Sequence, residues 1–400
     1  MFADGERRKI MKKVLFCLQT MVLGGVEKEL ITILKRMPPN EYNVTVLVFY
    51  TSDVDIMKQI PEHVKIIDLN IDKNYYCSSC FELCKRRIRK GKVIEAGEIL
   101  LKRFLGIGMT HVNINMSEIP FCEDRYDTAI CYHMHAPLTL RFVAEKIEAD
   151  KKIVWIHNDF KSTKFPVDKL KKYLDRFQEI IAVSYQVEKE FMQMCPEYRE
   201  KLHLCHNIVD VEEIVQKSDE SITDEIFTVG EEPKLLTVGR FTHQKAFDIA
   251  IKAAQILKRL NVKFKWFFIG AGELETEYRK LINEYNVEDK VFILGKKNNP
   301  YPYIKNCDIY IQPSRHEAYS IVMLEAKVLH RPIICSRFAG AEEQVIDQKN
   351  GCIVSLENVE ELAETIEELL RDIPKRTRFI KELQEENRED GWENIKNKID

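Results

Sequence analysis

Glycine and proline are scarce in this sequence. They account for 15 and 13 of its 400 residues, which is 7% of the chain against about 12% in average proteins. This scarcity excludes collagen-like and low-complexity chains, and a hydrophobic fraction of 45% excludes a largely disordered one. A chain of this length, 47.0 kDa, predicts two hydrophobic cores rather than one.

An excess of charge of one sign is also lacking. Lys and Arg number 61 and Asp and Glu 64, and a net charge of −3 argues against nucleic acid as a partner. Residues 85–103 are a local exception, because eight basic side chains, from Lys85 to Arg103, stand there against two acidic ones. With Leu100, Leu101 and Phe104 beside them, the stretch predicts either an amphipathic element on an anionic membrane surface or an ordinary helix with a solvated face.

Long apolar runs are absent as well. No stretch approaches the roughly 18 uninterrupted apolar residues of a membrane span, so no transmembrane helix is expected. Basic residues 7–13 precede an apolar run at 14–18, as in a signal peptide. The Gly24-Gly25 pair and the charged segment after it favour a first buried strand instead.

The cysteines indicate the compartment. Their number, eleven, is odd, and Cys17, Cys131 and Cys335 lie inside apolar runs, which is typical of free thiols in a reducing environment. We therefore predict a cytoplasmic protein, peripheral at the inner face of the membrane if residues 85–103 bind there.

No metal site is predicted. Cys77, Cys80 and Cys84 supply at most half of a zinc site, because no second cysteine pair or His-x3-His lies nearby. Asp53 and Asp55 form an Asp-x-Asp pattern after an early strand, which is typical of a solvated loop.

Apolar runs of strand length alternate with helical patterns along the whole chain, the rhythm of a parallel α/β architecture. Strands are predicted at residues 13–18, 43–50, 64–68, 128–132, 152–157 and 180–184, and after a polar stretch at 234–238, 264–269, 291–294, 308–312, 332–335 and 352–354. The fold class is α/β, with two doubly wound sheets facing a central cleft.

Five segments follow from this pattern. They are an N-terminal extension (1–11), a first sheet domain (12–207), a linker (208–233), a second sheet domain (234–375) and a helical C-terminal segment (376–400). The last segment is expected to pack back on the first domain with Trp392 as an anchor.

Two carboxylates flank a predicted strand-to-helix turn in the second half. Glu317 follows the strand at 308–312, and Glu325 stands eight residues later on a helix that begins near Ser320. The amides of Ser320, Ile321 and Val322 then form an anion site, and a carboxylate suits a sugar diol. The constellation spans a sugar, a diphosphate and a nucleoside, although on this segment alone a solvated Glu and a helix-face Glu are the simpler interpretation.

Cations at the end of another strand of the same half strengthen this interpretation. Gly239 permits a tight turn after residues 234–238, and Arg240 and Lys245 follow it. Two cations at this sheet edge can stabilise a departing diphosphate. Gly270 and Gly272, after the next strand, either contact the nucleotide or let the following helix start close to its strand.

The first half offers fewer candidates. Gly24 and Gly25 end the first strand and open a helix, whose amides can face the cleft from the opposite side. His157 ends another strand at the same edge, where an active-site role and a purely structural one are both open.

With these residues in place, the second half resembles the donor-binding half of retaining glycosyltransferases of the two-domain GT-B fold, in particular family 4 with its Glu-x7-Glu motif. The resemblance covers residues 234 to about 354, and the first half matches less, through Gly24-Gly25, His157 and residues 206–210. The sequence departs from the family at Ala246, at Ser320 and in the turn at 338–341, the last two of which bear on sugar choice.

The resemblance implies roles for these residues. Arg240 and Lys245 would bind the donor diphosphate, Glu317 the transferred sugar and Glu325 the ribose. Gly24 and Gly25 would approach the phosphate, His157 the donor sugar, and the backbone near Lys296 the base.

The resulting hypothesis is metal-independent transfer of a hexose with retention of its anomeric configuration. The expected donor is a nucleoside diphosphate sugar, and we expect the nucleoside to be uridine. The expected acceptor is a saccharide or a lipid-linked saccharide of cell-surface polysaccharide or glycolipid synthesis. No cofactor is expected. A nucleotide-sugar epimerase of the same fold and a non-catalytic nucleotide-sugar binding protein are the alternatives.

Overall fold

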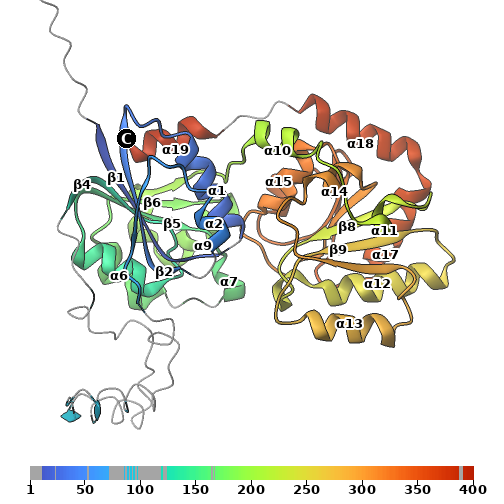
Figure 1. Cartoon of the computed structure of the whole chain (residues 1–400), viewed down its shortest axis with the longest axis horizontal. Coiled ribbons are helices and arrows are strands. Elements are labelled where there is room, and N and C mark those ends of the chain that lie inside the picture. Colours follow the sequence, from blue (N-terminus) through green and yellow to red (C-terminus); the bar gives the residue numbers. More distant parts are fainter. Residues whose placement is uncertain are drawn as a thin grey trace, which may run out of the picture.

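A computed structural model describes residues 11–71 apart from 23, 52 and 53, isolated residues between 85 and 97, residue 119, residues 124–386 apart from 164 and 166, and residues 391–400. The chain forms two α/β domains side by side, the first drawn in blue to green and the second in yellow to orange (Figure 1). This arrangement confirms the predicted fold class.

The first domain is built on a seven-stranded parallel sheet of order β3-β2-β1-β4-β5-β6-β7. Its central strands are continuous apolar runs because helices cover both faces of a parallel sheet. The six predicted strands are present, and β7 was not predicted because three residues show no pattern. The strands are β1 (Lys12–Met21), β2 (Tyr42–Thr51), β3 (Lys65–Asp68), β4 (Arg125–Cys131), β5 (Glu148–Ile156), β6 (Glu179–Ala182) and β7 (Leu202–Leu204).

The second domain has a six-stranded parallel sheet of order β10-β9-β8-β11-β12-β13. All six strands were predicted, with ends that differ by at most one residue. They are β8 (Lys234–Val238), β9 (Lys265–Ile269), β10 (Val291–Gly295), β11 (Ile309–Gln312), β12 (Ile333–Ser336) and β13 (Gly351–Val354).

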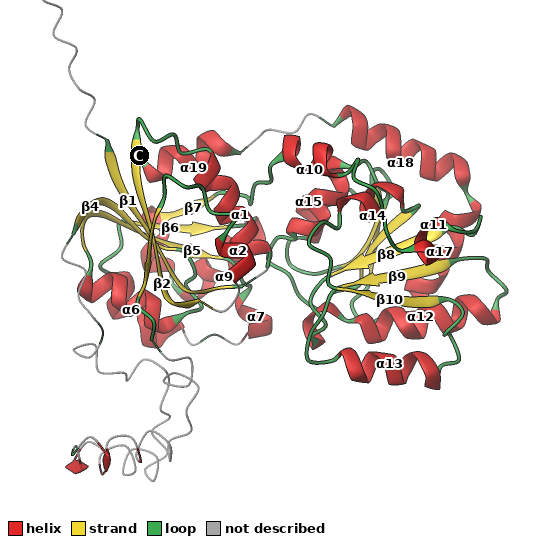
Figure 2. Cartoon of the chain, in the orientation of Figure 1, coloured by secondary structure: helices red, strands yellow, loops and turns green. Residues whose placement is uncertain are grey.

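Helices cover the sheets and form the cores. In the second domain α12 and α13 lie on one side of the sheet and α14 and α15 on the other (Figure 2). The first-domain helices are α1 (Gly25–Lys35), α2 (Val54–Met57), α6 (Pro137–Lys146), α7 (Phe160–Thr163), α8 (Lys171–Leu174) and α9 (Tyr185–Met194). The later helices are α10 (Val211–Lys217), α11 (Glu225–Thr228), α12 (Phe247–Arg259), α13 (Glu275–Glu284), α14 (Tyr301–Asn306), α15 (Ile321–Val328), α16 (Ala341–Gln344), α17 (Val359–Arg371), α18 (Ile373–Glu385) and α19 (Trp392–Ile399).

The segment predicted as a linker carries structure of its own. Ile214 of α10 and Phe227 of α11 are buried in one of the two cores of the second domain. Helices of seven and four residues are too short to show a clear hydrophobic period, so the sequence pattern does not predict them.

The C-terminal segment is divided between the domains. Helix α18 stays on the second domain with Phe379 in its core, whereas α19 lies against the first domain (Figure 1). Ile395 and Ile399 are buried in the first core, and Trp392 packs against it as a partly buried side chain. The expected return to the first domain therefore belongs to α19 alone.

Both sheets reverse their strand order at one point, between β1 and β4 and between β8 and β11. Loops that leave adjacent strands at such a point diverge to opposite sides of the sheet and leave a crevice at the carboxyl ends. The two crevices face each other, and the candidate site lies there.

Candidate functional site

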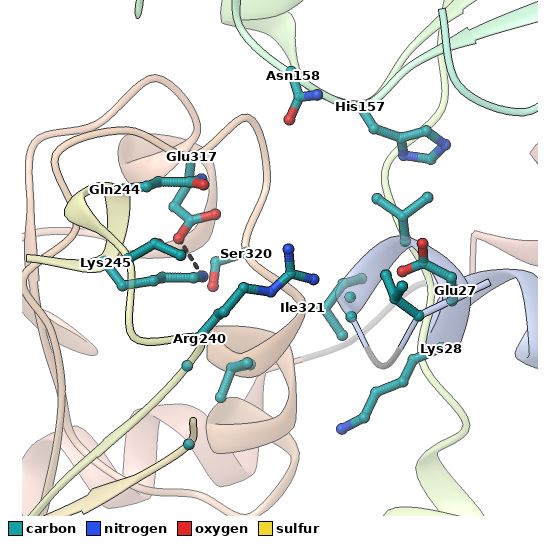
Figure 3. Close-up of a pocket in the computed structure, with 18 of the residues that line it drawn as sticks. Glu27, Lys28, His157, Asn158, Arg240, Gln244, Lys245, Glu317, Ser320 and Ile321 are labelled. Atoms are coloured by element: carbon teal, nitrogen blue, oxygen red, sulfur yellow. Dashed lines mark hydrogen bonds and ion pairs between the residues drawn. The ribbon is translucent and has the colours of Figure 1, made fainter. Parts of the chain in front are cut away.

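A cavity of about 830 Å³ lies between the two domains. Residues from the carboxyl ends of β1, β4 and β5 line it on one side, and residues that follow β8, β9, β10 and β11 line it on the other. Figure 3 shows the first-domain side chains of Glu27, His157 and Asn158 facing Arg240, Lys245 and Glu317 of the second domain. A cavity of this size is typical of a small-molecule site.

Arg240 follows β8 and reaches across the cleft. A Cβ atom placed on Gly24 of the first domain would lie 3.6 Å from the Arg240 guanidinium. The side chain is exposed, and within the described part of the chain it forms no hydrogen bond or ion pair. Its charge is therefore available to an anion in the cavity.

Lys245 is the second cation, at the end of a short 3-10 turn (His243–Lys245), and it pairs with Glu317. Ala246, where the family commonly has glycine, adopts φ +54° and directly precedes α12. The left-handed conformation explains why glycine suits this position.

Glu317 lies in the loop between β11 and α15, as predicted. Its Oε1 accepts hydrogen bonds from Ser314 Oγ at 3.0 Å and Gln312 Nε2 at 3.3 Å, besides the contact with Lys245. Among the described residues Oε2 has no hydrogen-bond partner. The carboxylate is thus fixed on one side and presents its other oxygen to the cavity.

Helix α15 begins where the sequence predicted it. The Ser320 hydroxyl accepts from Met323 N–H and caps the helix, while the Ser320 N–H donates to Gln344 Oε1 at 2.8 Å. The Ser320 amide is therefore engaged within the protein. The amides of Ile321 and Val322 remain for an anion at this helix N-terminus.

Gly270 and Gly272 allow a close crossing of two backbone segments. Gly270 adopts φ +156°, and a Cβ there would lie 1.9 Å from Gly239 O. A Cβ on Gly272 would lie 2.4 Å from Phe241 O. Gly270 lines the cavity and Gly272 does not. Of the two roles predicted for these glycines, contact with the nucleotide or a helix that starts close to its strand, the second therefore applies to Gly272.

The N-terminus of α1 forms part of the opposite wall. Gly24 is its N-cap, and a Cβ on Gly25 would lie 3.1 Å from Ile321, so the first turns of α1 and α15 meet across the cleft. Glu27, in the first turn, lines the cavity. Burial raises its pKa to about 7, although its own backbone amide and Arg240 oppose the rise.

His157 lines the cavity at the end of β5, and its side chain is 1% exposed. Neither ring nitrogen has a hydrogen-bond partner among the residues that the structure describes, and Nδ1 lies 3.7 Å from Glu29 Oε2. Burial, helped by His133 and His135, holds the His157 pKa well below its usual range. The imidazole is therefore neutral and able to hydrogen-bond a ligand hydroxyl.

Glu29 supports His157 from below the cavity. It is buried and accepts hydrogen bonds from Tyr132 Oη at 3.0 Å and from Ile208 N–H at 3.3 Å. Burial raises its pKa to about 8, which these two bonds oppose. Glu29 thus connects α1, the end of β4 and the segment that leads into the second domain.

The remaining predicted residues differ in position. Lys296 lines the cavity after β10, where its side chain is exposed. Glu325 is 1% exposed, pairs with Lys28 and is not among the cavity-lining residues. The structure therefore brings together the predicted residues other than Gly272 and Glu325.

Sequence reasoning missed several lining residues, namely Glu27, Lys28, His133, His135, Asn158 and Gln244. His133 and His135 follow β4 as His157 follows β5, so their position after a strand could have identified them in the same way. Burial lowers the His133 pKa to about 4 and the His135 pKa to about 3. Lys28 gave no signal, because its partner is 297 residues away.

Some predictions concern residues outside the described part of the chain. These are the cysteines at 77, 80 and 84, Asp53, and most of residues 85–103. Within the described ranges, no three or more metal-ligating side chains are grouped to bind an ion. The helices that the structure describes include none with the length and apolar character of a membrane span.

Known proteins resemble this chain in part of its sequence and in its fold. The family described as "Glycosyl transferases group 1" matches residues 218–386. A relative from Campylobacter jejuni, N-acetylgalactosamine-N,N'-diacetylbacillosaminyl-diphospho-undecaprenol 4-alpha-N-acetylgalactosaminyltransferase, is 31% identical over 43% of this chain and 45% of its own. The chain spans about half the length of the curated relatives that it matches.

Solved structures resemble the whole chain. WaaG, a glycosyltransferase involved in lipopolysaccharide biosynthesis, has a TM-score of 0.68 at 15% identity over 96% of this chain and 99% of its own. HepE from Anabaena, in complex with UDP-glucose, has a TM-score of 0.67 at 16% identity over 97% and 95%. Residues 218–386 are therefore similar to the glycosyl transferases group 1 family, and the chain as a whole has the GT-B fold.

Proposed function

We propose that this protein is a glycosyltransferase that moves a hexose from a UDP-linked sugar to an acceptor hydroxyl with retention of anomeric configuration. The observation that carries the proposal is the convergence of positive charge on the cavity. Arg240, Lys245 and the N-termini of α1 and α15 face one another across it. Such an arrangement suits a diphosphate, whose charge grows as it leaves.

Different residues bind different parts of the donor. Arg240 and Lys245 bind the diphosphate together with the amides of Ile321 and Val322. Glu317 orients the transferred sugar, and His157 hydrogen-bonds it from the other domain. Glu325 binds the ribose, and the backbone near Lys296 contacts the base.

The reaction that we propose is front-face transfer, as the resemblance to retaining glycosyltransferases implies. The bond between the anomeric carbon and the diphosphate oxygen breaks while the acceptor oxygen bonds to the same face of that carbon. The departing phosphate oxygen takes the acceptor proton, so no protein nucleophile is required. We propose that the two side-chain cations and the helix N-termini supply the needed positive charge without a metal ion.

The acceptor is a saccharide or a lipid-linked saccharide of cell-surface polysaccharide or glycolipid biosynthesis. Two similar proteins support this class, because the name of one includes a saccharide linked to diphospho-undecaprenol and the other is involved in lipopolysaccharide biosynthesis. The protein acts in the cytoplasm, and the basic residues 85–103 attach it to the inner face of the membrane. Binding to vesicles with anionic lipid should be lost when Arg86, Arg87 and Arg89 are changed to Glu, and unchanged binding would contradict the attachment.

A panel of nucleotide sugars, with and without a native lipid extract, tests the proposal. Release of UDP together with a glycosylated product, identified by mass spectrometry, is expected only when an acceptor is present. Conversion of the donor without an acceptor would identify an epimerase. Donor binding without any breakdown would identify a non-catalytic binding protein. A chelator should leave activity unchanged.

A further inference from the structure

The carboxylate of Glu325 is sealed from the cavity. Its side chain is 1% exposed, and its Oε2 atom is buried with no hydrogen-bond partner in the described ranges of the chain. The residues before it on α15, Ile321 and Val322, line the cavity, but Glu325 does not. A ligand in the cavity therefore cannot reach this carboxylate until a neighbouring group moves.

Lys28 is the cavity-lining side chain that covers Glu325. Its Nζ donates to Glu325 Oε1 at 2.8 Å, and it lies 5.2 Å from the centre of the Tyr301 ring. The Tyr301 hydroxyl donates to the same carboxylate oxygen at 3.3 Å. Oε1 thus has both of its acceptor positions filled, and Oε2 has neither.

The contact joins the two domains along matching helix faces. Gly25 and Lys28 lie one turn apart on α1, and they face Ile321 and Glu325, one turn apart on α15. The first pair lies at the helix N-termini, where the diphosphate is proposed to bind. The second pair lies one turn further on, where a ribose attached to that diphosphate would follow.

We propose that Lys28 is a positioning residue of the donor site, which holds Glu325 and gives it up to the ribose diol when a donor binds. This inference rests on the proposed nucleotide-sugar donor. The two ribose hydroxyls then donate to the carboxylate, one to the buried Oε2 and the other to Oε1 in place of the ammonium. Binding of the donor exchanges an ion pair between the domains for a bond to the ligand.

The exchange predicts that a substitution of Lys28 strengthens the binding of the ligand instead of weakening it. Lys28→Met removes a partner that stabilises Glu325 only while the site is empty, and a buried carboxylate without its counter-ion is unfavourable. The ribose diol then supplies hydrogen bonds that nothing else offers. A nucleoside diphosphate should therefore bind more tightly to this variant, by about tenfold, the equivalent of one hydrogen bond to a charged group.

Calorimetric titration with a nucleoside diphosphate and its 2′,3′-dideoxy analogue tests the inference. UDP, GDP and ADP are compared first, and the one that the intact protein binds is used. Lys28→Met should tighten the binding of the ribose form about tenfold and leave that of the dideoxy form unchanged, because only the diol competes for Glu325. Lys28→Arg should bind both ligands as the unmodified protein does.

Lys35→Met is the matched control. Lys35 also lies on α1 and pairs with Glu213 of α10, which belongs to the second domain, but it does not line the cavity. This variant should change the affinity for neither ligand. Thermal unfolding of each variant shows whether the fold is retained.

Three results would overturn the inference. They are weaker or unchanged binding of the ribose form by Lys28→Met, an equal change for both ligands, and equal affinity of the unmodified protein for both ligands. Each of these leaves the proposed donor intact if the diphosphate binds. Failure of the unmodified protein to bind any of the three diphosphates would overturn the proposed donor and this inference together.

Discussion

The second-domain wall of the cavity carries formal charges, with Arg240 and Lys245 beside the carboxylate of Glu317. The first-domain wall is lined largely by neutral polar groups, including His133, His157 and Asn158, and by the N-terminus of α1. One wall is suited to a diphosphate and the other to hydroxyl groups. The difference indicates that the two domains contribute differently to the same ligand, with side-chain charge mainly from the second domain and neutral hydrogen bonds mainly from the first.

The cationic wall should give the largest effect on activity. Arg240→Ala and Lys245→Ala should each lower turnover by about 10²–10³, because each removes preorganised positive charge from the leaving diphosphate. Steady-state kinetics with a UDP-sugar measures the loss. Lys258→Ala, which breaks an exposed pair with Asp289, should leave turnover unchanged. Near-normal activity of the Arg240/Lys245 double variant would refute the assignment.

The two walls also differ in how far the sequence reveals them. Arg240, Lys245 and Glu317 lie just after predicted strands, so position and charge were sufficient to select them. The strands themselves were recognisable because parallel strands are buried on both faces and form continuous apolar runs.

Other parts of the site depend on contacts between distant segments. Gln344 holds the Ser320 backbone from 24 residues away, and Lys28 seals Glu325 from 297 residues away. No local pattern announces either contact. Glu27 could not be selected from the sequence for another reason. Its raised pKa depends on burial, and only the assembled cleft buries it.

The backbone that carries the cationic wall should be sensitive to glycine substitution. Gly270→Ala places a Cβ 1.9 Å from Gly239 O and forces a non-glycine residue to φ +156°. We expect a loss of about 3 kcal/mol in the free energy of unfolding, from strain and overpacking together. Urea denaturation measures it. Gly295→Ala is the control, since φ is also positive there, at +74°, but a Cβ would meet no described neighbouring atom within 4 Å. It should lower the free energy of unfolding by about 1 kcal/mol.

The neutral wall should give a smaller effect. His157→Ala should lower donor turnover about 3- to 10-fold, the contribution of a neutral hydrogen bond. His157→Gln should retain most of the activity because an amide can replace the imidazole. The control is His203→Ala. His203 lies on β7, is partly exposed and is close to Glu179. A loss as large as that of Arg240→Ala would mean that the first-domain wall carries more than neutral hydrogen bonding.

Glu27 adds a carboxyl group to the first-domain wall, which also carries the ammonium of Lys28. Burial raises the pKa of Glu27 to about 7, although its own backbone amide and the guanidinium of Arg240 across the cleft oppose the rise. Below pH 7 the carboxyl is protonated and neutral. Above pH 7 it is ionised and repels a diphosphate held by Arg240.

The affinity for UDP should therefore fall about threefold as the pH rises from 6 to 8, a modest change because the repulsion acts in a partly hydrated cleft. Calorimetric titration across this range measures it. Glu27→Gln should remove this dependence and keep the affinity measured at pH 6, because an amide stays neutral throughout. Glu273→Gln, an exposed side chain that does not line the cavity, should leave the dependence in place. If Glu27→Gln retained the same pH profile, the titrating group would have to be sought elsewhere, and repulsion of the diphosphate by Glu27 would be refuted.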